Sequence, residues 1–207
     1  MKTLILLCAL LLCISGGGCG AARPSKYYQL TVPGDATPAS GSDLYHVTLV
    51  LAPITSSHLY REDHIVYTDN GQYMGVYQYQ RWAEPPTEMI GDVLLRELRA
   101  SAHFQGIYAW GSNVRADYIL RGHLYDFREI SASTLVGRVT LELELHDART
   151  GATVWMHFYT HDEPVTRKDV AAVVAALDHD VQQGIAEFSA SLDQYFSTHP
   201  EASASSQ

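Results

Sequence analysis

Residues 133–147 read STLVGRVTLELELHD, and from Val139 onward their apolar and polar side chains alternate. Alternation at a period of two predicts a β-strand that buries one face and leaves the other in solvent. The apolar face of this strand is therefore expected to meet a core. We expect Leu135, Val139, Leu141, Leu143 and Leu145 to face inward, and Arg138, Thr140, Glu142, Glu144 and His146 to face outward.

The segments on either side of this run are predicted to belong to the same sheet. Residues 117–129 (DYILRGHLYDFRE) form a second long strand in this interpretation. After residue 147 the chain is expected to turn, because Gly151 can adopt a left-handed backbone conformation at no steric cost. Residues 152–162 would then return as the partner strand, which predicts a largely antiparallel unit.

Further strands are predicted toward the N-terminus. Residues 27–32 (YYQLTV) and 44–52 both have strand character, and the second shows clear alternation. Residues 64–67 and 73–79 flank an Asn70-Gly71 pair. Because Asn-Gly tolerates the positive φ angles of tight turns, these two segments are predicted to form a β-hairpin.

Two amphipathic helices complete the predicted fold. Pro85 and Pro86 cannot continue a strand, but proline suits the first turn of a helix, which is expected to reach about Ala102. The signal at residues 166–169 resembles a helix cap, and the apolar stripe behind it reaches about Phe196. The sequence therefore predicts an α+β fold, with a mostly antiparallel sheet and two amphipathic helices packed on one face.

The first 19 residues, MKTLILLCALLLCISGGGC, have the features of a secretory signal. Lys2 precedes a short apolar run, which is too short to cross a bilayer. Small residues stand directly before Cys19, as in signals that are cut between Gly18 and Cys19 so that the cysteine can be acylated. Lipidation of Cys19 is the favoured interpretation. An ordinary cleaved signal in which Cys19 has no role is the alternative.

These features divide the chain into four parts. We predict a signal peptide at 1–18, a lipidated tether at 19–26, one folded domain at 27–197 and a disordered tail at 198–207. Cys8 and Cys13 would leave with the signal, so no disulfide can form within the mature chain. The formal net charge is −9, which argues against binding nucleic acid or lying flat on anionic lipid.

No strong catalytic or metal-binding motif stands out in the sequence. His157 and His161 are four residues apart, but in a strand this spacing separates side chains by about 13 Å, too far for one metal ion. Glu142 and Glu144 could form a carboxylate pair, yet acids that alternate with leucines are typical of a solvated face. The sequence therefore predicts no enzyme, no cofactor and no metal.

The aromatic residues have two interpretations. They could line a groove for a lipid or a peptide, or they could pack in the core and at the edges of the sheet, which we favour. The residues concerned are Tyr73, Tyr77, Tyr79, Trp82, Tyr108 and Trp110.

Four segments stand out from the generic pattern: residues 27–30 (YYQL), 59–61 (LYR), 65–67 (IVY) and 79–86 (YQRWAEPP). Together they resemble the ABC-type transport auxiliary lipoprotein family, whose PqiC-type members accompany MCE lipid-transport systems. The run Arg-Trp-Ala-Glu-Pro-Pro is the most specific of them. The resemblance covers most of the mature chain, although the second half diverges from the family pattern.

The resemblance implies a non-enzymatic lipoprotein held by its N-terminal lipid at the periplasmic face of the outer membrane, where it would contact an MCE protein of an ABC transporter. It leaves assembly into a homo-oligomer open. The alternatives are a structural or assembly lipoprotein of the outer membrane and, with less support, a periplasmic hydrolase.

Within the most specific segment we expect a structural motif. Arg61 and Arg81 would pair with acids such as Glu84. Trp82 would pack where the strand turns into the helix, and Pro85 and Pro86 would set the angle at which the helix begins.

Overall fold

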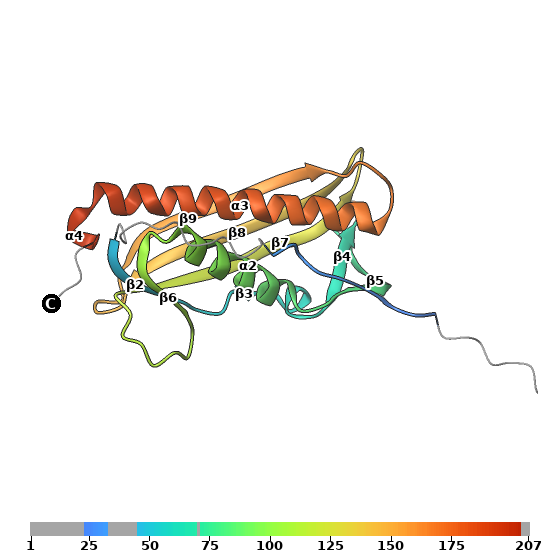
Figure 1. Cartoon of the computed structure of the whole chain (residues 1–207). Coiled ribbons are helices and arrows are strands. Elements are labelled where there is room, and N and C mark those ends of the chain that lie inside the picture. The colour runs from blue at the N-terminus through green and yellow to red at the C-terminus, as the bar shows by residue number, and fades with distance from the viewer. Residues whose placement is uncertain (1–22, 33–44, 70, 204–207) are drawn as a thin grey trace, which may run out of the picture.

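The computed structural model describes residues 23–32, 45–69 and 71–203 of the chain. They form one curled sheet with two long helices, α2 (Pro86–Ser101) and α3 (Val170–Thr198), on the same side (Figure 1). The predicted α+β fold is confirmed. The predicted signal peptide, the cleavage site at Gly18 and the acylation site Cys19 lie outside the described residues.

The central strand of the sheet is β7 (Tyr118–Ser131), which has neighbours along both edges. On one edge it pairs antiparallel with β8 (Leu135–Asp147) over almost its whole length. β8 in turn pairs antiparallel with β9 (Thr153–Pro164). These three strands confirm the antiparallel unit predicted from residues 117–162, including the turn in which Gly151 has a φ of 74°.

The other edge of β7 carries three short strands placed end to end, all parallel to it. They are β2 (Tyr45–Leu51), β3 (Thr55–Ser56) and β4 (His64–Thr68). The sheet is therefore mixed: its longest ladders are antiparallel, as predicted, but parallel ladders were not anticipated. Parallel pairing leaves no local signal, because its partners are joined by long crossovers.

Three more strands extend this edge of the sheet. β6 (Phe104–Ala109) pairs parallel with β2, β5 (Met74–Trp82) pairs antiparallel with β4, and β1 (Lys26–Tyr28) pairs parallel with β5. Neither β3 nor β6 was predicted, because both are too short to show a clear period.

The predicted β4–β5 hairpin is confirmed. Gly71 has a φ of 81°, and its N–H donates to Oγ1 of Thr68 at 2.9 Å. The same hydroxyl donates to the carbonyl of Tyr73 at 2.6 Å, which closes the turn. β5 is longer than predicted, so Arg81 and Trp82 belong to the strand and not to the junction that follows it.

The helix boundaries follow from local chemistry. Pro86 occupies the first turn of α2, where its missing N–H costs nothing. Asp169 caps α3, because its carboxylate accepts from the backbone N–H of Ala172 at 2.9 Å. Among the described residues, no helix is both long and apolar enough to cross a membrane.

One core lies between the helices and the inner face of the sheet. Trp82 is completely buried and packs on Phe127, with ring centroids 5.1 Å apart. Gly137 lets α3 approach β8, because a Cβ there would lie 3.1 Å from Leu177. The inward positions predicted on β8 agree: Val139, Leu141, Leu143 and Leu145 are buried and Leu135 packs against the core.

Part of the predicted disordered tail is ordered. α3 continues through Thr198, and a helical turn, α4 (Pro200–Ser203), follows it. The hydroxyl of Tyr118 donates to the carbonyl of Ala202 at 3.1 Å, and this bond ties the turn to the sheet. Residues 204–207 lie outside the described part of the chain.

A buried carboxylate, Asp180 of α3, joins the helix to the sheet. It accepts from the hydroxyl of Tyr159, from the backbone N–H of Val139 at 3.1 Å and from Nδ1 of His161 at 3.0 Å. Burial raises the pKa of Asp180 above its ordinary value, and these donors oppose that effect. The network makes Asp180 a polar cross-link inside the core.

Replacing Asp180 should therefore destabilise the fold strongly. We expect Asp180→Ala to lower the free energy of unfolding by about 3 kcal/mol, because the buried Tyr159 hydroxyl and Val139 N–H and the half-buried His161 ring lose their acceptor. Tyr159→Phe should cost only about 1 kcal/mol, since the carboxylate keeps its other donors. Urea denaturation measures both. Glu187→Ala, at an exposed site on the same helix, is the control, and an equal cost at 180 and 187 would contradict the assignment.

Candidate functional site

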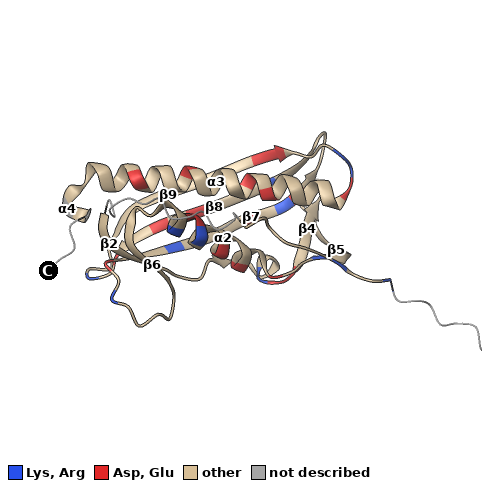
Figure 2. Cartoon of the chain, in the orientation of Figure 1, with Lys and Arg blue, Asp and Glu red and all other residues tan. Residues whose placement is uncertain are grey.

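The two helices cover one face of the sheet and leave the other open to solvent. On β7, β8 and β9 this open face carries charged residues interleaved with exposed apolar ones. Figure 2 shows acidic and basic residues alternating across these strands. The large apolar side chains exposed here are Tyr125, Met156 and Phe158, the last with 53% of its surface accessible.

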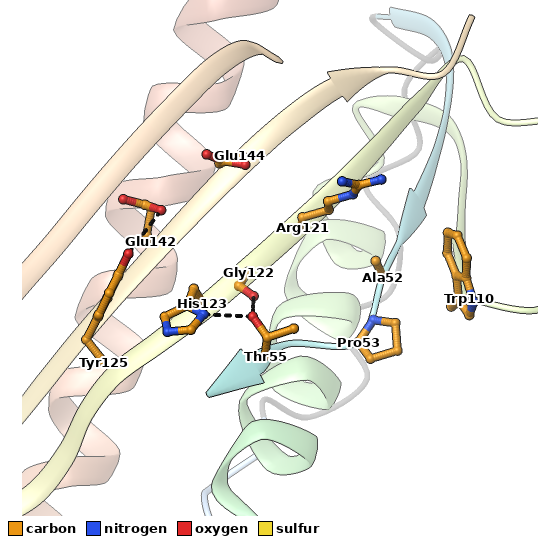
Figure 3. A pocket seen from close by; sticks show the side chains of 10 residues that line it. All are labelled: Ala52, Pro53, Thr55, Trp110, Arg121, Gly122, His123, Tyr125, Glu142 and Glu144. Carbon is orange, nitrogen blue, oxygen red and sulfur yellow. Dashed lines mark hydrogen bonds between the residues drawn. The ribbon is translucent and has the colours of Figure 1, made fainter. Parts of the chain in front are cut away.

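A hollow of about 530 Å³ opens on this face (Figure 3), and we call it the sheet hollow. It lies between β7, β8 and the segment that joins β2 to β3. Trp110, which is 58% exposed, stands at its edge, just after β6. The lining residues are Ala52, Pro53, Thr55, Trp110, Arg121, Gly122, His123, Tyr125, Glu142 and Glu144.

The charged groups of the sheet hollow differ in whether they have a hydrogen-bond or ion-pair partner. Glu142 accepts from the hydroxyl of Tyr125 at 3.4 Å, and Glu144 is held by Nε2 of His146 at 2.8 Å. The pKa of Tyr125 is raised above its ordinary value, mainly by partial desolvation and to a smaller extent by the Glu142 carboxylate. Arg121 is paired with Glu144 in the strand register, yet it forms no ion pair within the described residues. Its guanidinium is therefore free to meet an anionic group.

Thr55 and His123 form the one hydroxyl–imidazole contact of the sheet hollow, with Oγ1 and Nδ1 2.8 Å apart. The Thr55 hydroxyl donates to the carbonyl of Gly122 at 3.0 Å. Which of the two groups donates in their contact depends on the tautomer of His123.

A second hollow, of about 570 Å³, lies beside the first half of α2, and we call it the helix hollow. Its floor is largely apolar, and Trp110 stands at the border that it shares with the sheet hollow. Glu84, Glu88 and Asp92 follow one another at intervals of four along its wall. All three are exposed, and none forms an ion pair within the described part of the chain.

The structure separates the residues of the predicted motif. Arg81 pairs with an acid, as predicted, but the acid is Asp63, at 2.7 Å, and not Glu84, which we had named as an example. The reason is that β4 and β5 are neighbours, whereas Glu84 points into the helix hollow beyond the end of the strand. Arg61 lines the same hollow as Glu84 but makes no ion pair with it.

Three residues of the motif lie where the prediction placed them. Trp82 packs at the point where the chain leaves the sheet for α2. Pro85 is the residue before the helix, and Pro86 is its first residue. These positions agree with the structural interpretation of the junction.

The histidines of β9 have structural partners. His161 is held by Asp180, and the ring of His157 packs edge-on against Phe188 with centroids 5.0 Å apart. Within residues 23–32, 45–69 and 71–203, no group of three potential ligands is placed to hold a metal ion.

The six aromatic residues fall into both predicted classes. Trp82 is core, and the hydroxyl of Tyr77 donates to Glu129 at 2.7 Å. Tyr73, Tyr108 and Trp110 are exposed, and Trp110 borders both hollows.

Sequence reasoning missed Arg121 and His123 as neighbours of Glu142. They alternate outward on β7 as the glutamates do on β8, so the cross-strand register could have suggested the cluster.

Comparison with known proteins gives a consistent result. The family model described as ABC-type transport auxiliary lipoprotein component matches residues 28–188. No curated protein matches the chain in sequence.

Several solved structures share the fold. A Xanthomonas campestris protein of the DUF330 family is 22% identical with a TM-score of 0.69, over 79% of this chain and 92% of that one. An uncharacterised protein is 13% identical with a TM-score of 0.65, over 82% and 99%. A hypothetical protein of Chlamydia trachomatis is 9% identical with a TM-score of 0.50, over 72% and 97%. At these identities the likeness concerns the fold alone.

The partner of Arg81 can be tested by double-mutant cycles. We expect a coupling free energy of about 0.5 kcal/mol between Arg81→Ala and Asp63→Ala, because the pair is partly exposed and solvent screens it. The matched cycle with Glu84→Ala should give a coupling near zero. Urea denaturation provides both values, and a larger coupling to Glu84 would restore the predicted pair.

Two tryptophans should respond differently to truncation. Trp82→Ala is expected to cost about 3–5 kcal/mol, since it opens a cavity in the core. Trp110→Ala should change stability by less than about 0.5 kcal/mol, because its ring is largely in solvent. Thermal or urea unfolding measures the difference. Similar losses for both variants would mean that Trp110 supports the fold and is not a surface available to a partner.

Proposed function

This chain belongs to the ABC-type transport auxiliary lipoprotein family, and from that membership we propose that it is a non-catalytic auxiliary component of an MCE-type ABC transport system for lipids. In this proposal Cys19 carries the lipid that anchors the protein to the periplasmic face of the outer membrane. The domain then works beside the bilayer and contacts an MCE-domain protein.

The family match carries the proposal, and the start of the sequence supports it. The match begins at residue 28, shortly after a stretch that has the features of a lipoprotein signal. Gly20 follows Cys19 where an aspartate would favour retention in the inner membrane. For this reason the outer membrane is the proposed location.

A non-catalytic role fits the chemistry of the sheet hollow. The Thr55 hydroxyl donates to the carbonyl of Gly122 at 3.0 Å, which supports a structural role for this side chain. The sequence also contains no phosphate-binding loop, and we assign the use of ATP to a partner. The alternative of a periplasmic hydrolase has less support for the same reasons.

The helix hollow is the surface that we assign to the partner protein. Its wall presents the carboxylates of Glu84, Glu88 and Asp92, and its border presents the exposed ring of Trp110. Unpaired carboxylates above an apolar floor complement a segment that carries both lysine or arginine and apolar side chains. A basic amphipathic segment of the MCE protein is therefore the proposed occupant.

The anchor can be tested in cells that are fed labelled palmitate. We expect the label on the natural chain and none on Cys19→Ala, which should leave the membrane fraction because the acyl chains hold it there. Globomycin, which blocks the lipoprotein signal peptidase, should cause the precursor to accumulate. An unlabelled, soluble protein with a free thiol at residue 19 would overturn the anchor.

Docking can be tested by charge reversal at matched helical sites. Asp92→Lys should reduce recovery of the MCE protein by about tenfold, because it puts a cation into the acidic wall. Glu187→Lys makes the same change at an exposed site of α3 and should have little effect. Equal recovery with both variants would remove the helix hollow as the docking surface.

The assembly alternative predicts a different outcome in cells. Loss of the gene would lower the amount of another outer-membrane component and leave lipid flux unchanged. If the transport proposal holds, lipid flux falls while that component keeps its level.

A further inference from the structure

One end of the domain gathers features suited to a lipid surface. We call it the hairpin end and define it by the turn between β4 and β5 (residues 69 and 71–73), the turn between β7 and β8 (132–134) and the loop between β9 and α3 (165–169). These segments lie side by side. Thr68 pairs with Ile130, Val136 pairs with Pro164, and the N–H of Val165 donates to the carbonyl of Leu135 at 3.0 Å.

The N-terminal segment lies along β5 and, followed backward from Tyr28, heads toward this end. β1 runs parallel to β5 with Lys26 opposite Gln80, so the residues before Lys26 lead back toward the start of β5. The guanidinium of Arg23 lies 5.5 Å from the centre of the Tyr79 ring. Figure 1 shows this segment leaving beside β4 and β5, whereas the C-terminus lies at the opposite end of the molecule.

Chain length keeps Arg23, and with it the β1–β5 edge of the sheet, near any lipid on Cys19. Four peptide units separate Cys19 from Arg23, and they span at most about 14 Å when fully extended. Acyl chains on Cys19 would thus hold Arg23 close to the phospholipid headgroups. The domain cannot move away from the bilayer by more than this short reach.

Exposed apolar side chains are found at the hairpin end. Tyr73 is 64% exposed at the β4–β5 turn, and Met74 and Val76 follow it with much of their surface in solvent. Tyrosine is a residue that settles at the boundary between headgroups and hydrocarbon, where its ring is buried and its hydroxyl stays wet.

Positive charge is also gathered there, although the chain as a whole is acidic. Arg167 and Lys168 belong to the loop before α3, whereas Arg23 and Lys26 lie on the N-terminal segment beside Tyr79 and Gln80, farther along β5. Figure 2 shows these basic residues at the N-terminal segment and in the loop before α3. Bases close to an anionic membrane surface are attracted to it.

Three acids at or beside the hairpin end are engaged by other groups, whereas the exposed Asp69 of the β4–β5 turn forms no ion pair within the described residues. Asp162 is bound by Arg138 at 2.5 Å and Glu163 contacts His179 at 3.3 Å. Asp169 caps α3 and contacts Arg167 at 3.4 Å. Lys168 forms no ion pair within the described residues, so its charge is available to a phospholipid.

We propose that the hairpin end rests on the bilayer, with the ring of Tyr73 and the side chain of Met74 at the headgroup boundary and Lys168 and Arg167 on anionic phospholipids. This inference rests on the proposed lipid anchor at Cys19. It makes the hairpin end a second contact with the membrane, one that orients the domain, where the acyl chains alone would only tether it. The overall negative charge excludes lying flat on the membrane but not this end-on contact.

Site-directed spin labels test the orientation. The acylated mature protein is placed in vesicles of phosphatidylethanolamine and phosphatidylglycerol, with a nitroxide on Tyr73→Cys or, as the control, on Phe158→Cys of the open sheet face. Cys19 is blocked by its lipid and does not compete for the label. We expect collisions with a water-soluble nickel chelate to be at least threefold rarer at residue 73 than at 158.

Equal nickel accessibility at the two sites, in protein that floats with the vesicles, would overturn the proposal. Protein that does not float would instead show that the lipid anchor is wrong, so the two failures are distinguishable. Arg167→Glu with Lys168→Glu should raise nickel access at residue 73 toward the value at 158. The matched double variant Arg96→Glu with Arg149→Glu changes exposed sites elsewhere and should leave nickel access at residue 73 unchanged. Equal effects of the two double variants would contradict the contribution of Arg167 and Lys168.

Discussion

The whole sheet depends on the backbone hydrogen bonds of β7. This strand pairs with β8 along one edge and with β2, β3 and β4 in succession along the other. Every other strand reaches β7 directly or through one neighbour, except β1, which reaches it through β5 and β4. A buried strand must satisfy its N–H and C=O groups on both edges, so three short strands are held in place by one long partner.

A bulge in β7 determines what the two faces of the sheet present. The register with β8 shifts between Leu124 and Asp126, which leaves Tyr125 without a counterpart. Before the bulge the residues of β7 that face the core have even numbers, such as Leu120 and Leu124. After it the core-facing residue is the odd-numbered Phe127. Bulges redirect side chains in this way. Tyr125 is turned out beside Glu142, where it helps to form the sheet hollow on the face that no helix covers.

The distribution of charge gives the domain an axis. Carboxylates line the helix hollow on α2, while the basic residues before α3 lie at the hairpin end and those of the N-terminal segment lie along β5. In the proposed function, one part of the surface receives a basic partner segment and another meets anionic lipid. In both contacts opposite charges attract over a short range, because salt screens charges that are farther apart. The contact with anionic lipid could not be inferred from the net charge of the chain, which is acidic.

The sequence by itself determined the features that depend on neighbours along the chain. The glycine at the Asp147–Gly151 turn and the proline that begins α2 are local, and both were predicted correctly. The alternation in residues 139–146 correctly predicted the inward side chains, but Thr140 and His146, which we expected in solvent, are buried. The parallel ladders, the Asp63 partner of Arg81 and both hollows were decided only by the tertiary structure. A side-chain period reveals which face of a strand is buried but carries no information on which distant strand lies beside it, so long-range partners are set by packing.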